Sequence, residues 1–197
     1  MLTKTQIKIL EIFVSRIIER FSIKQISEIL NKPYPLIHRS IAPLISREII
    51  LKDDKGYLYL NYKKNFTLFS YIESLRKDNF IKNNKILGLF FNDILNKLNL
   101  DFFILLVFGS SVVSNNPKDL DLIFISEDES KINHLEKQII NISKDYTKEF
   151  DINVISIKSV YEMLSKRDSI NILNESLNNH IIIYGGEFFY KILKNAR

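Results

Sequence analysis

Cysteine is absent from the 197 residues of this chain, and glycine and proline are scarce, with five and four residues respectively. Without cysteine, the protein cannot be a disulfide-stapled secreted domain, nor can it hold zinc through thiolates. No run of eighteen apolar residues occurs, which is the length that a membrane-spanning helix needs. Charged residues at Lys4, Lys8 and Glu11 interrupt the first apolar stretch, so no signal peptide is expected. The sequence therefore predicts a cytoplasmic protein with no membrane partner.

The composition that is present suits a folded protein with a phosphate-bearing partner. Hydrophobic residues make up 46% of the chain, which is enough for a real core, and charged residues make up 26%. The length allows one compact domain or two small ones. The formal net charge is +5, and a basic excess of this kind is compatible with binding nucleic acid or nucleotide phosphates.

The first sixty residues carry the pattern of three helices and a hairpin. Apolar residues recur at helical spacing after Thr3 and Thr5, either of which could cap the first helix. Ser22, with glutamine three residues later, fits the capping box of a second helix. Pro35 suits the first turn of a third helix that ends near Glu48. Two short apolar runs on either side of residues 54–56 then predict a β-hairpin.

This order of elements resembles the winged helix-turn-helix domains of prokaryotic regulators, over residues 1–63. The resemblance implies that the third helix is the recognition helix, that the hairpin is the wing, and that the domain contacts DNA. Basic and polar side chains on these two elements are the candidate nucleic-acid-binding residues: His38, Arg39, Arg47, Lys52 and Lys55. A connector helix is expected over residues 64–82.

Residues 83–197 have the sequence pattern of a small α/β domain. The run "FFILLVF" predicts a strand that is buried on both faces. Further strands are expected at "DLDLIFI", "DINVISI" and "HIIIY", with a helix over residues 131–148 and helical sequence before residue 178. The whole chain is therefore expected to be of the α/β (α+β) class, with a mixed sheet flanked by helices.

The stretch from Phe108 to Ile125 contains the main candidate catalytic residues. Gly109 and Ser110 directly follow the buried strand, and Asp119 and Asp121 begin the next one. Side chains alternate faces along a strand, so the two carboxylates are predicted to project on the same side. Oxygen ligands in this arrangement suit hard divalent cations such as Mg²⁺.

A Gly-Ser pair, a short loop and an Asp-x-Asp pair resemble the signature of the DNA polymerase beta nucleotidyltransferase superfamily, in particular its small minimal nucleotidyltransferase branch. The family takes a third carboxylate from a later strand, and Asp151 at the start of "DINVISI" matches it. The resemblance implies that Asp119, Asp121 and Asp151 are catalytic and hold Mg²⁺ or Mn²⁺. It also implies that Gly109, Ser110 and Ser111 bind the phosphates of ATP or another nucleoside triphosphate.

The expected activity is transfer of a nucleoside monophosphate from a triphosphate to a hydroxyl group. Some relatives in this superfamily are antitoxins that adenylylate a partner toxin protein, and such a partner is one option for this chain. Lys118 and Lys131 are further candidate neighbours of the phosphates.

The chain also departs from the family pattern. The branch usually carries an aromatic residue, alanine, arginine and glycine after the Gly-Ser pair, whereas residues 111–114 here are Ser-Val-Val-Ser. This departure leaves a second hypothesis open. It is a DNA-binding regulator whose nucleotidyltransferase fold is catalytically silent or only senses nucleotide. The three retained carboxylates argue against a silent site, because like charges at close range repel each other and are costly to keep.

Overall fold

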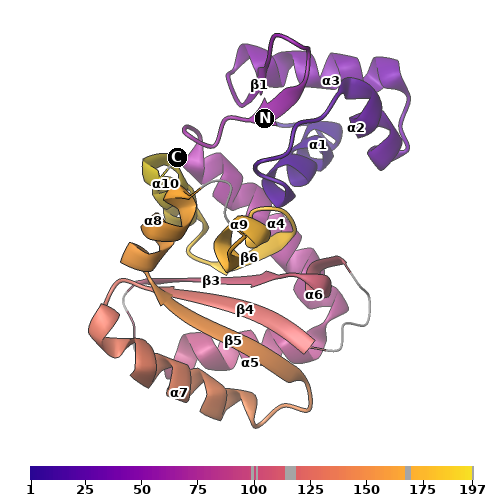
Figure 1. Ribbon diagram of the computed structural model, residues 1–197. Helices are drawn as coiled ribbons and strands as arrows, with labels where there is room; N and C mark the ends of the chain where they lie inside the picture. The colour runs from indigo at the N-terminus through magenta and orange to yellow at the C-terminus, as the bar shows by residue number, and fades with distance from the viewer. Residues whose placement is uncertain (99, 101, 114–118, 167–169, 197) are drawn as a thin grey trace.

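The computed structural model describes residues 1–98, 100, 102–113, 119–166 and 170–196, and it confirms the mixed α/β class (Figure 1). Helices and strands are interspersed along the chain, and the larger sheet is mixed. In the described part of the chain, no helix is both long and apolar enough to cross a membrane.

The N-terminal part consists of three helices and a two-stranded hairpin. Its elements are α1 (Lys4–Ser15), α2 (Ile23–Leu30), α3 (Tyr34–Ser46), β1 (Ile50–Lys52) and β2 (Leu58–Leu60). Thr3 and Ser22 both form the capping boxes that their sequence spacing predicts. Gly56 adopts a φ of +88° in the turn between the two strands, which pair antiparallel.

The rest of the chain builds a four-stranded sheet with helices on both faces. Its first elements are α4 (Phe66–Asn83), α5 (Lys85–Lys97), β3 (Phe103–Phe108), α6 (Ser110–Val113), β4 (Asp119–Ser126) and the 3-10 turn η1 (Glu129–Lys131). They are followed by α7 (Ile132–Ser143), β5 (Glu149–Ser156), α8 (Ile157–Ser165), α9 (Ile172–Ser176), β6 (His180–Tyr184) and α10 (Gly186–Ala196).

The strand order is β5-β4-β3-β6, in which β3 is antiparallel to both β4 and β6, and β4 is parallel to β5. Helices α5 and α7 cover one face, as Figure 1 shows below the sheet. Helices α4, α8 and α10 contribute to the core against the other face. Helix α7 ends earlier than the predicted residue 148. The chain turns after Ser143, and the Tyr146 hydroxyl donates a hydrogen bond of 2.9 Å to Asp93 on α5.

The N-terminal helices and the sheet share one hydrophobic core. A single buried cluster contains Phe13 of α1, Phe69 of α4 and Tyr190 of α10. Backbone hydrogen bonds add to this contact, because the Ile17 N–H donates to the Leu177 carbonyl at 3.0 Å and the Asn179 N–H donates to the Ser15 carbonyl at 2.7 Å. The three-helix part is therefore held against α9 and β6 by backbone pairing as well as by apolar packing.

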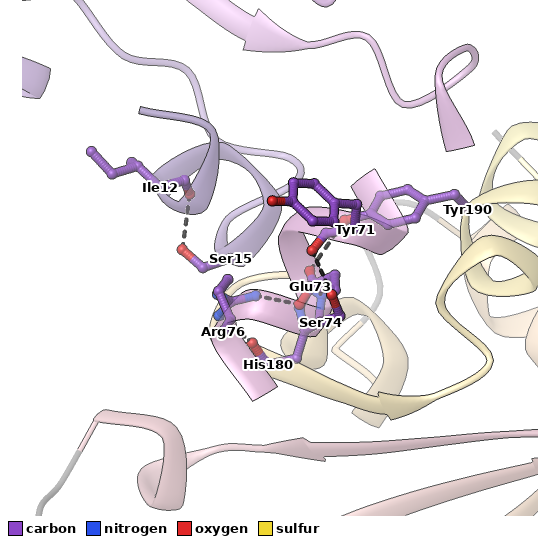
Figure 2. Close-up of polar contacts among 8 residues, drawn as sticks. All are labelled: Ile12, Ser15, Tyr71, Glu73, Ser74, Arg76, His180 and Tyr190. Atoms are coloured by element: carbon purple, nitrogen blue, oxygen red, sulfur yellow. Dashed lines mark hydrogen bonds and ion pairs between the residues drawn. The ribbon is translucent and has the colours of Figure 1, made fainter. Parts of the chain in front are cut away.

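A buried polar cluster ties α4 to β6 and α10 (Figure 2). The Glu73 carboxylate, 1% exposed, accepts hydrogen bonds from Arg76 at 2.7 Å and from the Tyr190 hydroxyl at 3.2 Å. Arg76 also donates to the backbone carbonyl of His180 at 2.5 Å. The His180 Nε2 lies 3.4 Å from Glu73 Oε1, yet neither ring nitrogen has a hydrogen-bond partner in the described part of the chain. We therefore regard this contact as electrostatic.

Glu73 is ionised despite its burial. Burial is the largest single influence and raises the pKa of Glu73, but Arg76, His180 and Tyr190 together outweigh it and lower that pKa below its ordinary value. A carboxyl group whose pKa is lowered by folding stabilises the fold above its unfolded pKa, and this stabilisation is lost as the pH falls through the folded pKa. The cluster therefore stabilises the fold at neutral pH and weakens it in acid.

Replacing Glu73 by alanine should destabilise the protein by about 3–5 kcal/mol, because it leaves the nearly buried Arg76 guanidinium without its counter-charge. Urea unfolding at pH 7 measures the loss. Glu162→Ala on the exposed side of α8 is the matched control, and it should change stability by less than about 0.5 kcal/mol. A Glu73→Ala loss no larger than that of the control would contradict the assigned role.

Candidate functional site

Strand β4 divides its side chains between the two faces of the sheet. Leu120 and Leu122 are buried in the core beneath α5 and α7. Ile123 and Ile125 are buried on the opposite face. Side chains alternate along a strand, so Asp119 and Asp121 lie on the same face as these isoleucines, at the end of the strand where that face is half-exposed.

The register of the sheet sets four side chains in one row across the strands. Asp121 is the direct partner of Phe108 on β3 and of Asp151 on β5. Phe108 is in turn the partner of His180 on β6. Directly opposed residues project on the same face. The structure thus brings Asp121 and Asp151 side by side on adjacent strands, and Asp119 lies two residues from Asp121 on that face.

Gly109 forms the turn that ends β3 against this row. Its φ is +69°, a left-handed conformation that L side chains rarely adopt. A Cβ atom at this position would clash with the Oδ2 atom of Asp121. The backbone N–H of the following Ser110 donates a hydrogen bond to the Asp121 carboxylate. Glycine is therefore needed here for two reasons, the backbone angle and the close approach of the carboxylate.

The two serines after Gly109 have different surroundings. Ser110 is exposed and its hydroxyl can face a ligand. Ser111 is 3% exposed, and its hydroxyl donates to the Phe108 carbonyl at 2.8 Å. The Ser111 hydroxyl is thus engaged in holding the turn between β3 and α6, which leaves Ser110 as the serine whose hydroxyl is available at the surface.

Among the residues that the structure describes, the charged neighbours that shift the pKa of Asp121 are Asp119 and Asp151, and both are negative. Burial raises the pKa of Asp121 first, and the neighbouring charges of Asp119 and Asp151 raise it further, against the lowering effect of the Ser110 N–H. The two strand neighbours thus repel the ionised form of Asp121. Such repulsion is relieved either by a proton or by a bound cation.

Among the described residues, no group of three or more His, Cys, Asp or Glu side chains is arranged so that it could hold a metal ion. Magnesium, however, is often bound through only one or two carboxylates, with water and substrate phosphates completing the shell. The described carboxylates therefore supply at most part of the shell of a metal ion.

The sequence also singled out two lysines as candidate neighbours of the phosphates. Lys118, expected near the phosphates, lies outside the described residues. Lys131 forms an ion pair of 3.0 Å with Asp128, so its charge is already partly compensated. The sequence reasoning missed Asn153, whose amide lies 3.4 Å from the Asp151 carboxylate. The same-face rule that joined Asp119 to Asp121 would have found it two residues beyond Asp151.

We call Asp119, Asp121 and Asp151 the acidic row. The basic residues predicted to bind nucleic acid lie away from it, on the N-terminal elements. His38, Arg39 and Arg47 are exposed on or directly after α3, and Lys52 and Lys55 are exposed on the hairpin. The main packing contacts of α3 are with α1, α2 and β1, so its outer side is not covered by the sheet domain.

Comparison of the chain with known protein families, with curated proteins and with solved structures found no match.

Replacing Gly109 by alanine should cost about 1–2 kcal/mol for the positive φ, and more because of the contact with Asp121. Gly56→Ala is the matched control, since it imposes the same kind of backbone strain while its nearest described neighbour is the flexible end of Lys52 at 3.7 Å. Urea unfolding should therefore show a larger loss for Gly109→Ala. The excess should disappear in an Asp121→Ala background. If the two glycine variants lose equal stability, the close approach of Gly109 to Asp121 is wrong.

Proposed function

We propose that this protein is a metal-dependent nucleotidyltransferase that transfers a nucleoside monophosphate from ATP or another nucleoside triphosphate to a hydroxyl group. One observation carries the proposal. Asp121 and Asp151 are direct partners on parallel strands, Asp119 shares their face, and the Gly109 turn abuts Asp121. Carboxylates that repel one another beside a glycine turn favour a ligand that brings both phosphate and metal.

Each residue has a separate role in this proposal. Asp119 and Asp121 would hold Mg²⁺ or Mn²⁺, which would neutralise charge on the triphosphate. Gly109 lacks a side chain, so backbone N–H groups near it and the Ser110 hydroxyl can approach the phosphate oxygens. Asp151 completes the metal site on the β5 side. A bound metal ion would neutralise charge on the phosphates and orient the displacement.

The transfer follows from these roles. The hydroxyl oxygen of the acceptor forms a bond to the α-phosphorus, and the bond from that phosphorus to the bridging oxygen of the pyrophosphate breaks. Asp151 is exposed and receives the hydroxyl proton, while pyrophosphate leaves with the electron pair of the broken bond. Asp121 already accepts the Ser110 N–H, which keeps its carboxylate fixed at the end of β4.

The Asp119→Asn, Asp121→Asn double variant should lose transfer by several orders of magnitude and remain folded. Asparagine keeps the volume and can still accept the Ser110 N–H, but it removes the charge that binds metal. Transfer of radiolabel from α-labelled ATP measures the loss. Glu127→Gln and Glu129→Gln, which are exposed beyond the far end of β4, are the matched controls.

The same variant has a pH signature. A carboxyl group whose pKa is raised by folding stabilises the fold below its unfolded pKa, and this contribution is lost as the pH rises through the folded pKa. The double variant should therefore melt at the wild-type temperature or above it near pH 7, and any gain should shrink below about pH 4. An unfolded variant would make the two residues structural, and a folded variant with full transfer would refute the site.

A second candidate function, DNA binding through α3 and the hairpin, is favoured by the charge pairing in this region. Two of its acidic residues already have basic partners, because Asp53 pairs with Arg20 and Glu48 with Lys64. The remaining cations are exposed and form no ion pair with any residue that the structure describes: Arg39, Arg47, Lys52 and Lys55. A winged helix would present such a surface to the phosphate backbone.

The Arg39→Ala, Arg47→Ala double variant should bind duplex DNA more weakly and lower the slope of log K against log salt by about 2, one for each lost phosphate contact. Fluorescence anisotropy with a labelled duplex over a range of salt measures both effects. Lys137→Ala, Lys144→Ala on α7 and just beyond its end removes the same charge elsewhere and should leave binding unchanged. If both double variants lose DNA affinity equally, net charge alone explains the effect. If the arginine variant binds DNA as tightly as the wild type, α3 does not contact the DNA.

A further inference from the structure

A cleft of about 530 Å³ lies where the N-terminal helices meet the sheet domain. One wall is α1, which contributes Lys8 and Glu11. The opposite walls are the end of α4 with Asn79 and Asn83, and the short helix α6. The volume falls within the range that small-molecule sites occupy. Because the walls come from both parts of the chain, an occupant of the cleft would contact both.

The cleft is separate from the acidic row. None of Asp119, Asp121 and Asp151 lines it. Its contribution from the sheet is Ile181 on β6, and β3 lies between β6 and β4. Adjacent strands are about 4.8 Å apart, so Ile181 lies about 10 Å from β4 across the sheet, whereas Ser111, which also lines the cleft, directly follows Ser110 beside Asp121. The chain passes between them at residues 109–113, with Gly109 against Asp121 and α6 against the cleft.

The cations that line the cleft are already paired. Lys8 lies 2.7 Å from Glu11, and Arg76 is held by the Glu73 carboxylate at 2.7 Å and by the His180 carbonyl (Figure 2). A phosphate or carboxylate ligand would have to displace these partners. Compensated charge therefore favours an uncharged ligand over an anion.

The polar groups that remain available are amides. The side chains of Asn79 and Asn83 are exposed and make no hydrogen bond with any residue that the structure describes. They lie one turn apart on α4, so both can hydrogen-bond to the same ligand. Each amide offers a donor and an acceptor, which is the pattern that the edge of a nucleobase complements. Phe80, between them in sequence, also lines the cleft and supplies an aromatic ring.

We propose that this cleft binds an uncharged nucleoside or nucleobase, separately from the acidic row. Asn79 and Asn83 hydrogen-bond the edge of the base, and Phe80 packs against its ring. Since α1 forms one wall, the bound nucleoside bridges the N-terminal helices and the sheet domain. The inference rests on the cleft alone and does not require the proposed transferase activity.

The test is calorimetric titration of the full chain with adenosine, guanosine, cytidine and uridine, in a chelator and without phosphate. At least one nucleoside should bind. The Asn79→Ala, Asn83→Ala double variant should bind it at least about tenfold more weakly, which corresponds to about 1.4 kcal/mol. Asn92→Ala, Asn96→Ala is the matched control, because it removes two exposed asparagines with the same spacing from α5, outside the cleft.

The Asp119→Asn, Asp121→Asn variant separates this inference from the transferase proposal. It should bind the nucleoside as the wild type does, because neither residue lines the cleft. Loss of binding in that variant would move the nucleoside to the acidic row and overturn the inference. So would the absence of binding for all four nucleosides, or equal binding by the Asn79→Ala, Asn83→Ala variant and the wild type.

Discussion

Strand β3 is hydrogen-bonded on both edges and buried at every position, and the arrangement of the candidate site depends on this constraint. A shift of one residue would turn its apolar side chains to the wrong faces, so its register with β4 and β6 is fixed. That register aligns His180, Phe108 and Asp121 in one row, which β5 extends to Asp151. Gly109 then ends the strand and turns the chain against Asp121.

Two carboxylates, one near each end of this row of side chains, have pKa values that shift in opposite directions. At one end, Glu73 faces His180 and is matched by Arg76 and Tyr190, so its pKa is lowered although it is buried. Near the other end, burial raises the pKa of Asp121, and the carboxylates of Asp119 and Asp151 raise it further against the lowering effect of the Ser110 N–H. The first carboxylate has its counter-charge within the protein. The charged neighbours of the second, among the residues that the structure describes, are both acidic, and this contrast is the physical reason for proposing a metal-bound nucleotide at Asp121.

Local signals in the sequence predicted most elements and the shared face of Asp119 and Asp121. The capping boxes at Thr3 and Ser22 act over three residues, and strand alternation acts over two, so both can be recognised without a structure. Long-range packing could not be predicted in this way. Tyr190 meets Glu73 across 117 positions, and the cleft joins Lys8 of α1 to Asn83 of α4. No periodicity encodes such contacts, and the hydrogen bond from Tyr146 to Asp93, just beyond the early end of α7, is another of them.

The most direct test of the central claim is calorimetry of ATP binding with and without magnesium, on the wild type and on an Asp151→Asn variant. The claim is that the carboxylates of β4 and β5 bind nucleotide through metal. It predicts that ATP binds with magnesium, that a chelator removes this binding, and that Asp151→Asn weakens it. ATP affinity that is equal in magnesium and in chelator would contradict the account.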